Sequence, residues 1–385
     1  MNPHPAADLT IVGAGPAGLA LATALAQAGI RSRVLERQPL AAIEQPAEDG
    51  REIALTHRSR RILQQLGIWQ RLPAAEISPL RQARVSNGRS PFVLPFSAPG
   101  DDVLGWLVPN FRLREAAFAA AAAEPGVTID GERSVTGLSR ERHGATLTLA
   151  DGTACSTPLV IAADSRFSAL RRMAGIGAQM LDFGRVAIVT RMEHGGEHDG
   201  VAHECFRYGN TLATLPLPGR CSSAVLTLKA DEAPAWLALG EAAFAARIER
   251  QLEGRLGAMR LAGPRHHYPL VAVYAHRFAA DRFALVGDAA VGMHPVTAHG
   301  YNFGLYGVEV LAREWARTQG DAALFAYEAE HRRATRPIYE GTNAIVRLFT
   351  DDRLPAKLLR GAVLRVASHL PPVQSLISRQ LTQAA

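Results

Sequence analysis

Hydrophobic and polar residues at the start of the chain follow the periods of a strand, a helix and a second strand. The apolar run Leu9–Val12 has the length and composition of a buried strand. An alanine-rich stretch over 19–28, which stops at Gly29, predicts a helix. A second short strand is predicted over 33–35. This part of the chain therefore reads as a complete strand–helix–strand unit.

Further along the chain the pattern mixes helical and strand periods. In chain order, the expected elements are a helix over 51–72, strands and turns over 80–107, a helix over 110–124, a hairpin and buried strand over 146–164, short strands over 180–275 with one helix at 240–255, a strand at 284–286 and a helix from 301. Helical and strand segments in this order predict an α/β fold, α+β overall, with a strand-rich insertion.

Three glycines between the first strand and helix give the first chemical signal. In Gly13-x-Gly15-x-x-Gly18, the first glycine makes the tight turn, the second lets the backbone approach a pyrophosphate, and the third allows close packing of helix on strand. The helix N-terminus supplies amide donors for phosphates. Glu36, at the end of the second strand, can accept both hydroxyls of an adenosine ribose. A nucleotide without a 2′-phosphate is therefore expected here.

A second polar turn, over 287–302, follows the strand at 284–286. Asp288 stands at the carboxyl end of that strand, where open α/β sheets bind ligands. The chain then turns through Pro295 and Gly300 into the helix that begins near Tyr301. The first amides of this helix would face whatever lies on the turn, and its dipole would stabilise a negative charge there. We expect a second contact with the same long nucleotide.

Composition adds little to this picture. The chain has 385 residues and a formal net charge of +6, but only Lys229 and Lys357 among its 42 basic residues are lysines. A compositional bias explains so many arginines as well as an anionic ligand does, and dispersed basic residues with 6% aromatics argue against nucleic-acid binding. Three cysteines without metal spacing predict neither a disulfide framework nor a metal site. The glycine-broken N-terminal run is not a signal peptide, so a cytoplasmic protein is expected.

The glycine motif with Glu36, the segment AADSRFSALRR and the stretch GDAAVGMHP…HGYNFGL together resemble the single-component FAD-dependent aromatic hydroxylases. Their order and spacing look most like the ubiquinone-biosynthesis hydroxylase branch, and the loop at 297–300 is similar to that of demethoxyubiquinol hydroxylases. The resemblance spans essentially the whole chain. It implies a discontinuous Rossmann-like FAD-binding domain (1–75, 100–175 and 276–350), an antiparallel β-sheet substrate domain (76–99 and 176–275) and a C-terminal helical segment (351–385).

The resemblance also implies which residues contact FAD. In chain order these are Gly13, Ala14, Gly15, Pro16, Ala17, Gly18, Glu36, Arg37, Arg51, Asn110, Asp164, Gly287, Asp288, Pro295, Gly300, Tyr301 and Asn302. On the residues alone, Arg51 is as well explained as a surface arginine. The chain departs from the family at Ser165, where a glycine is usual, at Thr297-Ala298-His299-Gly300 in place of Ala-Gly-Gln-Gly, and at Gly307 in place of an aspartate.

The implied reaction needs NADH or NADPH as the electron donor and molecular oxygen. Reduced FAD would react with oxygen at C4a, and the terminal oxygen of the hydroperoxide would pass to the ring of a phenol or quinol, expected to be prenylated. Pro295 would lie against the flavin, and His299 is the candidate base, unless it only holds its own loop. Leu215 and Pro216 would line the substrate pocket, unless they are plain sheet core.

The C-terminal segment predicts a partner. Its apolar residues Leu359, Val363, Val366 and Leu370 share one helical face beside basic residues. Such a helix could lie on the inner face of a membrane, or pack on its own core or a second subunit. Other quinone-biosynthesis enzymes are further candidate partners. Two rival functions stay open: a reductase of prenyl lipids, which would turn over without oxygen, and a silent flavin-binding assembly factor, which would show no substrate-stimulated oxygen uptake.

Overall fold

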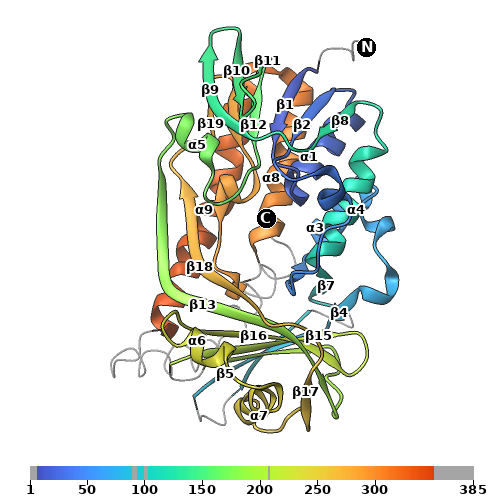
Figure 1. Cartoon of the computed structure of the whole chain (residues 1–385), viewed down its shortest axis with the longest axis vertical. Coiled ribbons are helices and arrows are strands. Elements are labelled where there is room, and N and C mark those ends of the chain that lie inside the picture. Colours follow the sequence, from blue (N-terminus) through green and yellow to red (C-terminus); the bar gives the residue numbers. More distant parts are fainter. Residues whose placement is uncertain (1–6, 89–92, 99–102, 207–208, 298, 351–385) are drawn as a thin grey trace.

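The computed structural model describes residues 7–88, 93–98, 103–206, 209–297 and 299–350. Two sheets dominate it, one above the other in Figure 1, and strands β13 (Ala178–His194) and β18 (His266–Ala275) run between the two halves. The expected α/β class is confirmed. The expected C-terminal helical segment, 351–385, lies outside the described residues.

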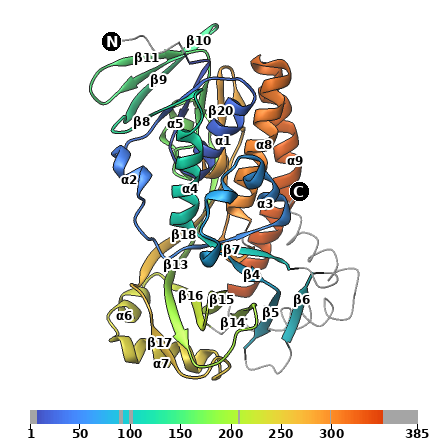
Figure 2. The same ribbon diagram turned by 90° about the vertical axis from the view of Figure 1, so that its right-hand side faces the viewer.

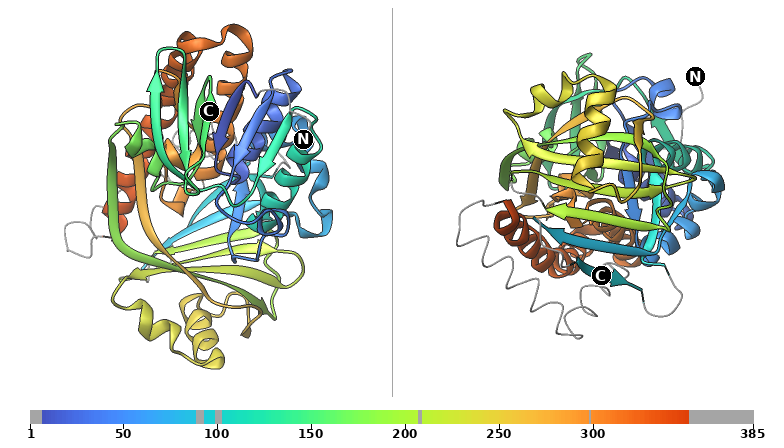
Figure 3. Two further views of the ribbon diagram at one scale, coloured as in Figure 1. Left: turned by 45° about the horizontal axis from the view of Figure 1, so that its top comes forward. Right: turned by 90° about the horizontal axis from the view of Figure 1, so that it is seen from below.

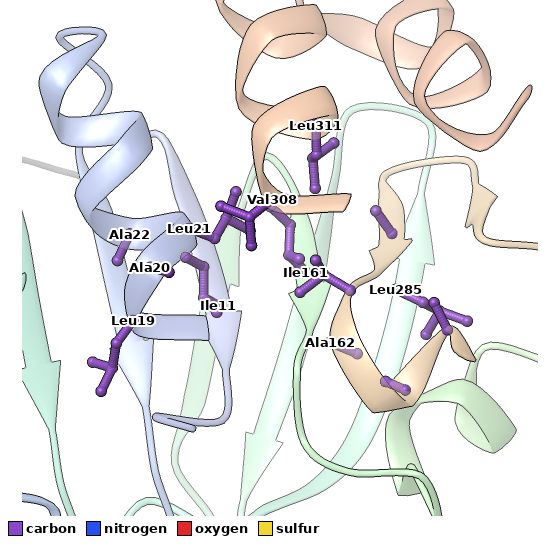
Figure 4. Close-up of a cluster of buried hydrophobic side chains, with 14 of the residues drawn as sticks. Ile11, Leu19, Ala20, Leu21, Ala22, Ile161, Ala162, Leu285, Val308 and Leu311 are labelled. Atoms are coloured by element: carbon purple, nitrogen blue, oxygen red, sulfur yellow. The ribbon is translucent and has the colours of Figure 1, made fainter. Parts of the chain in front are cut away.

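The upper sheet has six strands in the order β19-β20-β12-β1-β2-β8, all parallel except for the short β19. Its strands are β1 (Leu9–Val12), β2 (Ser32–Leu35), β8 (Val127–Asp130), β12 (Val160–Ala162), β19 (Ala279–Ala280) and β20 (Phe283–Leu285). Helices α1 (Pro16–Gln27), α4 (Asn110–Ala122) and α8 (Gly300–Thr318) pack beside it. In Figure 4, Leu21 of α1 and Val308 of α8 meet over Ile161 of β12, all three buried.

The lower sheet has nine strands, in the order β21-β18-β13-β16-β15-β14-β5-β6 with β17 paired to β13. Besides β13 and β18, these are β5 (Gln82–Asn87), β6 (Val93–Ser97), β14 (Val201–Phe206), β15 (Thr211–Leu217), β16 (Cys221–Lys229), β17 (Met259–Leu261) and β21 (Val291–Gly292). Helices α6 (Ala233–Leu237) and α7 (Glu241–Gln251) cover its outer face, as the view from below in Figure 3 shows. The sequence predicted α7 but not α6.

Two three-stranded sheets and four helices complete the fold. One sheet joins β9 (Val135–Glu141), β10 (Gly144–Leu149) and β11 (Ala154–Thr157), and the other joins β3 (Glu52–Leu55), β4 (Ser78–Leu80) and β7 (Gly105–Pro109). The helices are α2 (Leu40–Glu44), α3 (His57–Gln65), α5 (Ala169–Met173) and α9 (Gly320–Thr350), the last lying along α8 in Figure 2. None of the described helices is both long and apolar enough to cross a membrane.

The structure corrects one prediction: the segment 51–72 is not a single helix. Its first part, Glu52–Leu55, is a strand that pairs with β7, and α3 ends at Gln65. The boundary is local, because the Thr56 hydroxyl accepts a hydrogen bond from the Ser59 N–H and caps α3. The pairing partner of β3 is about fifty residues away in the chain, so nothing local identified β3 as a strand. The helical spacing of the residues after Thr56 was therefore extended over it.

Gly307 in α8 faces a buried histidine of α9, which leaves no room for a side chain at this position. A Cβ at Gly307 would lie 2.6 Å from Cε1 of His331. His331 is fully buried, and its ring nitrogens lie 3.1 Å from the carbonyl oxygen of Phe303 and 3.1 Å from the hydroxyl of Tyr327. The imidazole is therefore held in place and fills the space that a side chain would need.

We expect Gly307→Ala to lower the free energy of unfolding by about 2 kcal/mol, because overpacking forces buried groups to shift. Gly341→Ala, in α9, is the matched control: its Cβ would meet nothing within 4 Å, so the helix propensity of alanine should leave stability equal or slightly higher. Urea unfolding of both variants measures the difference. Equal stabilities would show that His331 yields to the added methyl group.

Candidate functional site

The parallel strands of the upper sheet bring the sequence motifs to one edge. Strands β1, β2, β12 and β20 lie side by side, so their carboxyl ends share that edge. The segments that leave it are the turn at 13–18, Glu36, Asp164 and the turn at 287–288. Ligands of open α/β sheets bind outside the carboxyl ends of the strands. The structure thus brings together four segments that are far apart in the sequence.

The three glycines after β1 have different structural roles. Gly13 has a φ of +112°, and a Cβ there would lie 2.4 Å from the carbonyl oxygen of Ala163. A Cβ at Gly18 would lie 2.1 Å from the carbonyl oxygen of Gly13, whereas one at Gly15 would meet nothing within 4 Å. Gly13 and Gly18 therefore serve the packing, and Gly15 keeps open the space before α1. No side chain caps α1, so its first amides are available to a ligand.

Glu36 fixes the turn and still has accepting capacity. Its Oε2 accepts a hydrogen bond from the Ala14 N–H at 2.8 Å, and its Oε1 accepts one from the Gln38 N–H at 3.1 Å. Each carboxylate oxygen has a further lone pair, which a ribose hydroxyl can use. Arg37, beside it, is exposed at the same edge.

Two aspartates follow the adjacent strands β12 and β20. The Oδ2 of Asp164 accepts a hydrogen bond from the Leu170 N–H at 3.3 Å, while its Oδ1 is buried and has no hydrogen-bond partner among the described residues. The Oδ2 of Asp288 pairs with Arg166 at 2.8 Å. Asp288 belongs to the short 3₁₀ turn Gly287–Ala289. Arg166 was missed from the sequence, although the motif that contains it was recognised.

Arg51 and Asn110 meet through a residue that the sequence analysis did not single out. The Asp49 Oδ2 accepts hydrogen bonds from Nη2 of Arg51 at 2.6 Å and from Nδ2 of Asn110 at 2.7 Å. The Arg51 guanidinium, with its hydrogen bonds, lowers the pKa of Asp49, against the opposing effect of burial. Nearly half of the Arg51 side chain is exposed, so the pair presents a cation at the surface of the loop before β3.

The turn before α8 is largely buried. His299, the N-cap residue of α8, is 4% exposed and stacks on Phe303 with ring centroids 5.3 Å apart. No side chain caps α8, so its first amides are also available to a ligand. The Asn302 side chain is committed to the fold, since it accepts from the Thr56 N–H and donates to the Ala54 carbonyl oxygen. The fold therefore holds this side chain in place.

Two further polar groups border this turn. The Tyr301 hydroxyl is buried with no hydrogen-bond partner among the described residues, and burial raises its pKa. His294 precedes the 3₁₀ turn that begins at Pro295, and its Nδ1 accepts from the Val296 N–H at 3.2 Å. Burial lowers the His294 pKa to about 4, so the ring is neutral at physiological pH.

The register of the lower sheet separates the two residues expected to line the substrate pocket. Leu215 pairs with Ser223 and points to the face of the sheet that bears Glu204. Pro216 pairs with Ser222 and points to the opposite face, on which Leu212 packs against α7. The structure therefore places only Leu215 on the face turned toward the upper sheet.

Ser165 takes a backbone conformation that favours glycine. Its φ is +151°, in the left-handed region that only glycine adopts without strain. We expect Ser165→Gly to raise the free energy of unfolding by about 1 kcal/mol, because relief of strain exceeds the added entropy of the unfolded chain. Ser139→Gly, at an exposed position of β9 without positive φ, should lower it. Thermal unfolding of both variants tests the sign, and a loss of stability in Ser165→Gly would contradict the strain argument.

The donor set at this edge fits a flavin dinucleotide. It provides two uncapped helix N-termini for phosphates and a flavin ring, a carboxylate for an adenosine ribose, and two aspartates beside the space between them. The orphaned Asp164 oxygen and the open space beside Gly15 are both explained if a polar ligand fills them.

Comparison with known proteins agrees with this geometry. Residues 6–341 match the family described as FAD binding domain. The ubiquinone hydroxylase UbiM of Neisseria meningitidis is 43% identical over 97% of this chain and 84% of its own. UbiL of Rhodospirillum rubrum, a ubiquinone hydroxylase, is 38% identical over 97% and 89%. Among solved structures, p-nitrophenol 4-monooxygenase PnpA of Pseudomonas putida superposes with a TM-score of 0.78 at 17% identity, over 98% of both chains.

Proposed function

Because this chain belongs to the FAD binding domain family and, within it, to the ubiquinone hydroxylases, we propose that it hydroxylates the aromatic ring of a prenylated phenol or quinol. The observation that carries the proposal is the convergence of two uncapped helix N-termini, α1 and α8, on the edge that holds Glu36 and Asp288. A long ligand with a pyrophosphate in its middle and, at one end, a flat ring that becomes anionic on reduction would use both.

In this proposal the residues of the upper sheet hold the cofactor. The amides after Gly15 take the pyrophosphate, Glu36 takes the adenosine ribose, and Asp288 takes the ribityl chain. Arg51, joined to Asn110 through Asp49, places a cation near the middle of the cofactor. FAD, reduced by NADH or NADPH, supplies the activation of molecular oxygen when bound.

The residues of the turn before α8 position the ring. Pro295 begins the 3₁₀ turn before α8, and the backbone over 300–302 forms the first residues of α8; the proposal places both against the flavin. The burial of His299 and its stacking on Phe303 support a role in holding this turn rather than in proton transfer. Leu215, on the opposing sheet, would contact the substrate.

Access to a lipid-soluble substrate suggests peripheral membrane binding. The basic amphipathic pattern over 357–370 would supply the contact. That segment lies outside the described residues, so the sequence alone supports this part of the proposal. Flotation of the full chain with anionic vesicles, compared with a chain ending at residue 350, tests it.

The function is tested by oxygen consumption. Purified protein, reconstituted with FAD, is given NADH or NADPH with and without a 2-prenylphenol, and products are identified by mass spectrometry. Substrate-stimulated oxygen uptake with one added oxygen atom in the product is the expected result. Reduction of the prenyl chain without oxygen would indicate a reductase, and bound FAD with no stimulated uptake would indicate a silent flavin-binding protein.

A further inference from the structure

The face of the lower sheet that looks toward the upper half is identified by its contacts; we call it the inner face. Phe206 of β14 and Val85 of β5 lie in one hydrophobic cluster with Val296, from the turn before α8. The neighbouring Cys205 points the other way and packs with the α7 residue Ile248. The inner face thus opposes the turn that the proposed function places against the flavin.

One row of side chains crosses the inner face. Over β13, β16, β15, β14, β5 and β6 it contains a single polar group, and it continues on β18 with His266, the register partner of Val189. The backbone register aligns, strand by strand, Val189, Val225, Ala213, Glu204, Val85 and Leu94. Paired residues in neighbouring strands point to the same face, so Glu204 projects from an otherwise apolar row. A carboxyl group here has no role in packing.

Glu204 also lacks a partner. Among the described residues, no hydrogen bond or ion pair is made by its side chain. It is half-buried: protein surrounds it closely enough to desolvate the carboxylate, while part of its surface stays open. Burial raises its pKa to about 8. Glu52 differs because it has a partner: burial raises its pKa, Arg191 at 3.0 Å opposes this rise, and the resulting pKa is about 7.

The electrostatic surroundings of Glu204 do not offset this burial. The titratable groups on the inner face include Arg185, Arg191, Glu193, Cys221, Lys229, His266 and Tyr268. The segments packed against this face carry Glu48, Asp49, Arg51, Glu52, His294, His299, Tyr301 and Arg347. Burial is the one cause of the shift, and none of these groups contributes a charge effect. An unpaired buried carboxyl group is costly and therefore points to a ligand that satisfies it.

We propose that Glu204 binds the ring hydroxyl of the substrate and accepts its proton; this inference rests on the proposed hydroxylase function. The proton passes from the hydroxyl oxygen to a carboxylate oxygen, and the bonding electron pair remains on the phenolate oxygen. The phenolate ring is richer in electrons, which favours attack on an electrophilic oxygen atom. The apolar row on both sides of Glu204 suits the flat faces of the ring.

The test is a comparison of E204Q, E204D and a matched control, E197Q, with the FAD-loaded enzyme and a 2-prenylphenol as the probe. Glu197 is 61% exposed and pairs with Arg220. We expect E204Q to keep its bound flavin but to lose about 100-fold in kcat/KM. Wild-type kcat/KM should rise as the pH passes about 8 and Glu204 ionises. This rise should be absent in E204Q and shifted to lower pH in E204D, whereas E197Q should match the wild type.

The outcomes separate the two proposals. If the wild type does not hydroxylate any phenol, the proposed function fails. If the wild type hydroxylates the probe and E204Q keeps the wild-type kcat/KM and pH profile, Glu204 is not the proton acceptor. Should E204Q lose its flavin, E204D decides, because an unshifted pH profile in that variant overturns the inference.

Discussion

Gly15→Val should purify without FAD while remaining as stable as the wild-type protein stripped of its cofactor. A Cβ at Gly15 meets no protein atom within 4 Å, and the residue's φ of −72° suits any side chain. The added side chain would instead fill the space into which the proposal places the pyrophosphate. Loss of two charge-assisted hydrogen bonds should weaken FAD binding by about 3 kcal/mol, roughly 100-fold in Kd.

Gly18→Ala is the contrasting variant. Its Cβ would lie 2.1 Å from the carbonyl oxygen of Gly13, so the protein without cofactor should itself be destabilised. Flavin absorbance, FAD titration and unfolding of the stripped proteins distinguish the two effects. A Gly15→Val protein that binds FAD with wild-type affinity would place the nucleotide elsewhere.

Asp288→Ala should also lose about 100-fold in FAD affinity. The cause here is the loss of a charged hydrogen-bond acceptor, whereas in Gly15→Val it is the filling of the space for the pyrophosphate. Removing the carboxylate deletes the acceptor proposed for the ribityl hydroxyls and leaves Arg166 without the partner that it has at 2.8 Å. Asp288→Asn, which keeps an acceptor oxygen but loses the ion pair, should bind FAD with an intermediate affinity. FAD titration followed by flavin fluorescence measures all three proteins.

Glu197→Ala is the matched control for this removal of a carboxylate. Glu197 pairs with Arg220 at 2.6 Å, both side chains are exposed, and it lies in the connection between β13 and β14 of the lower sheet. FAD affinity should be unchanged. An Asp288→Ala protein with the affinity of this control would remove Asp288 from the cofactor site.

Local signals made much of the upper sheet predictable. The strand Leu9–Val12 has the predicted bounds, and α1 begins at Pro16, three residues before the predicted start, because proline suits the first turn of a helix. The pattern over 51–72 gave a wrong prediction of one continuous helix. Glu52–Leu55 is a strand because it pairs with residues near 107. The partner of a strand is not encoded in the periodicity of the strand's own segment, and short segments such as this one take their state from that partner.

The candidate site also contains residues that the sequence predicted and one that only the structure revealed. Glycine spacing and the residues that follow apolar strands identified Glu36, Asp164 and Asp288, because parallel strands must end at one edge. Nothing around Asp49 in the sequence indicated that it would link Arg51 to Asn110. That link depends on the distance between the loop before β3 and the first residue of α4, which only the folded chain fixes.

By itself, the sequence predicted which segments leave the carboxyl edge of the upper sheet, and it determined the family and the kind of chemistry, because these depend on residue types at short, fixed spacings. The tertiary structure decided which face of the lower sheet opposes the turn before α8, and so which of Leu215 and Pro216 looks inward. It also decided that Glu204 stands alone in an apolar row. The physical reason is register: a shift of one residue in a strand reverses every side chain, and register is set by pairing between distant segments.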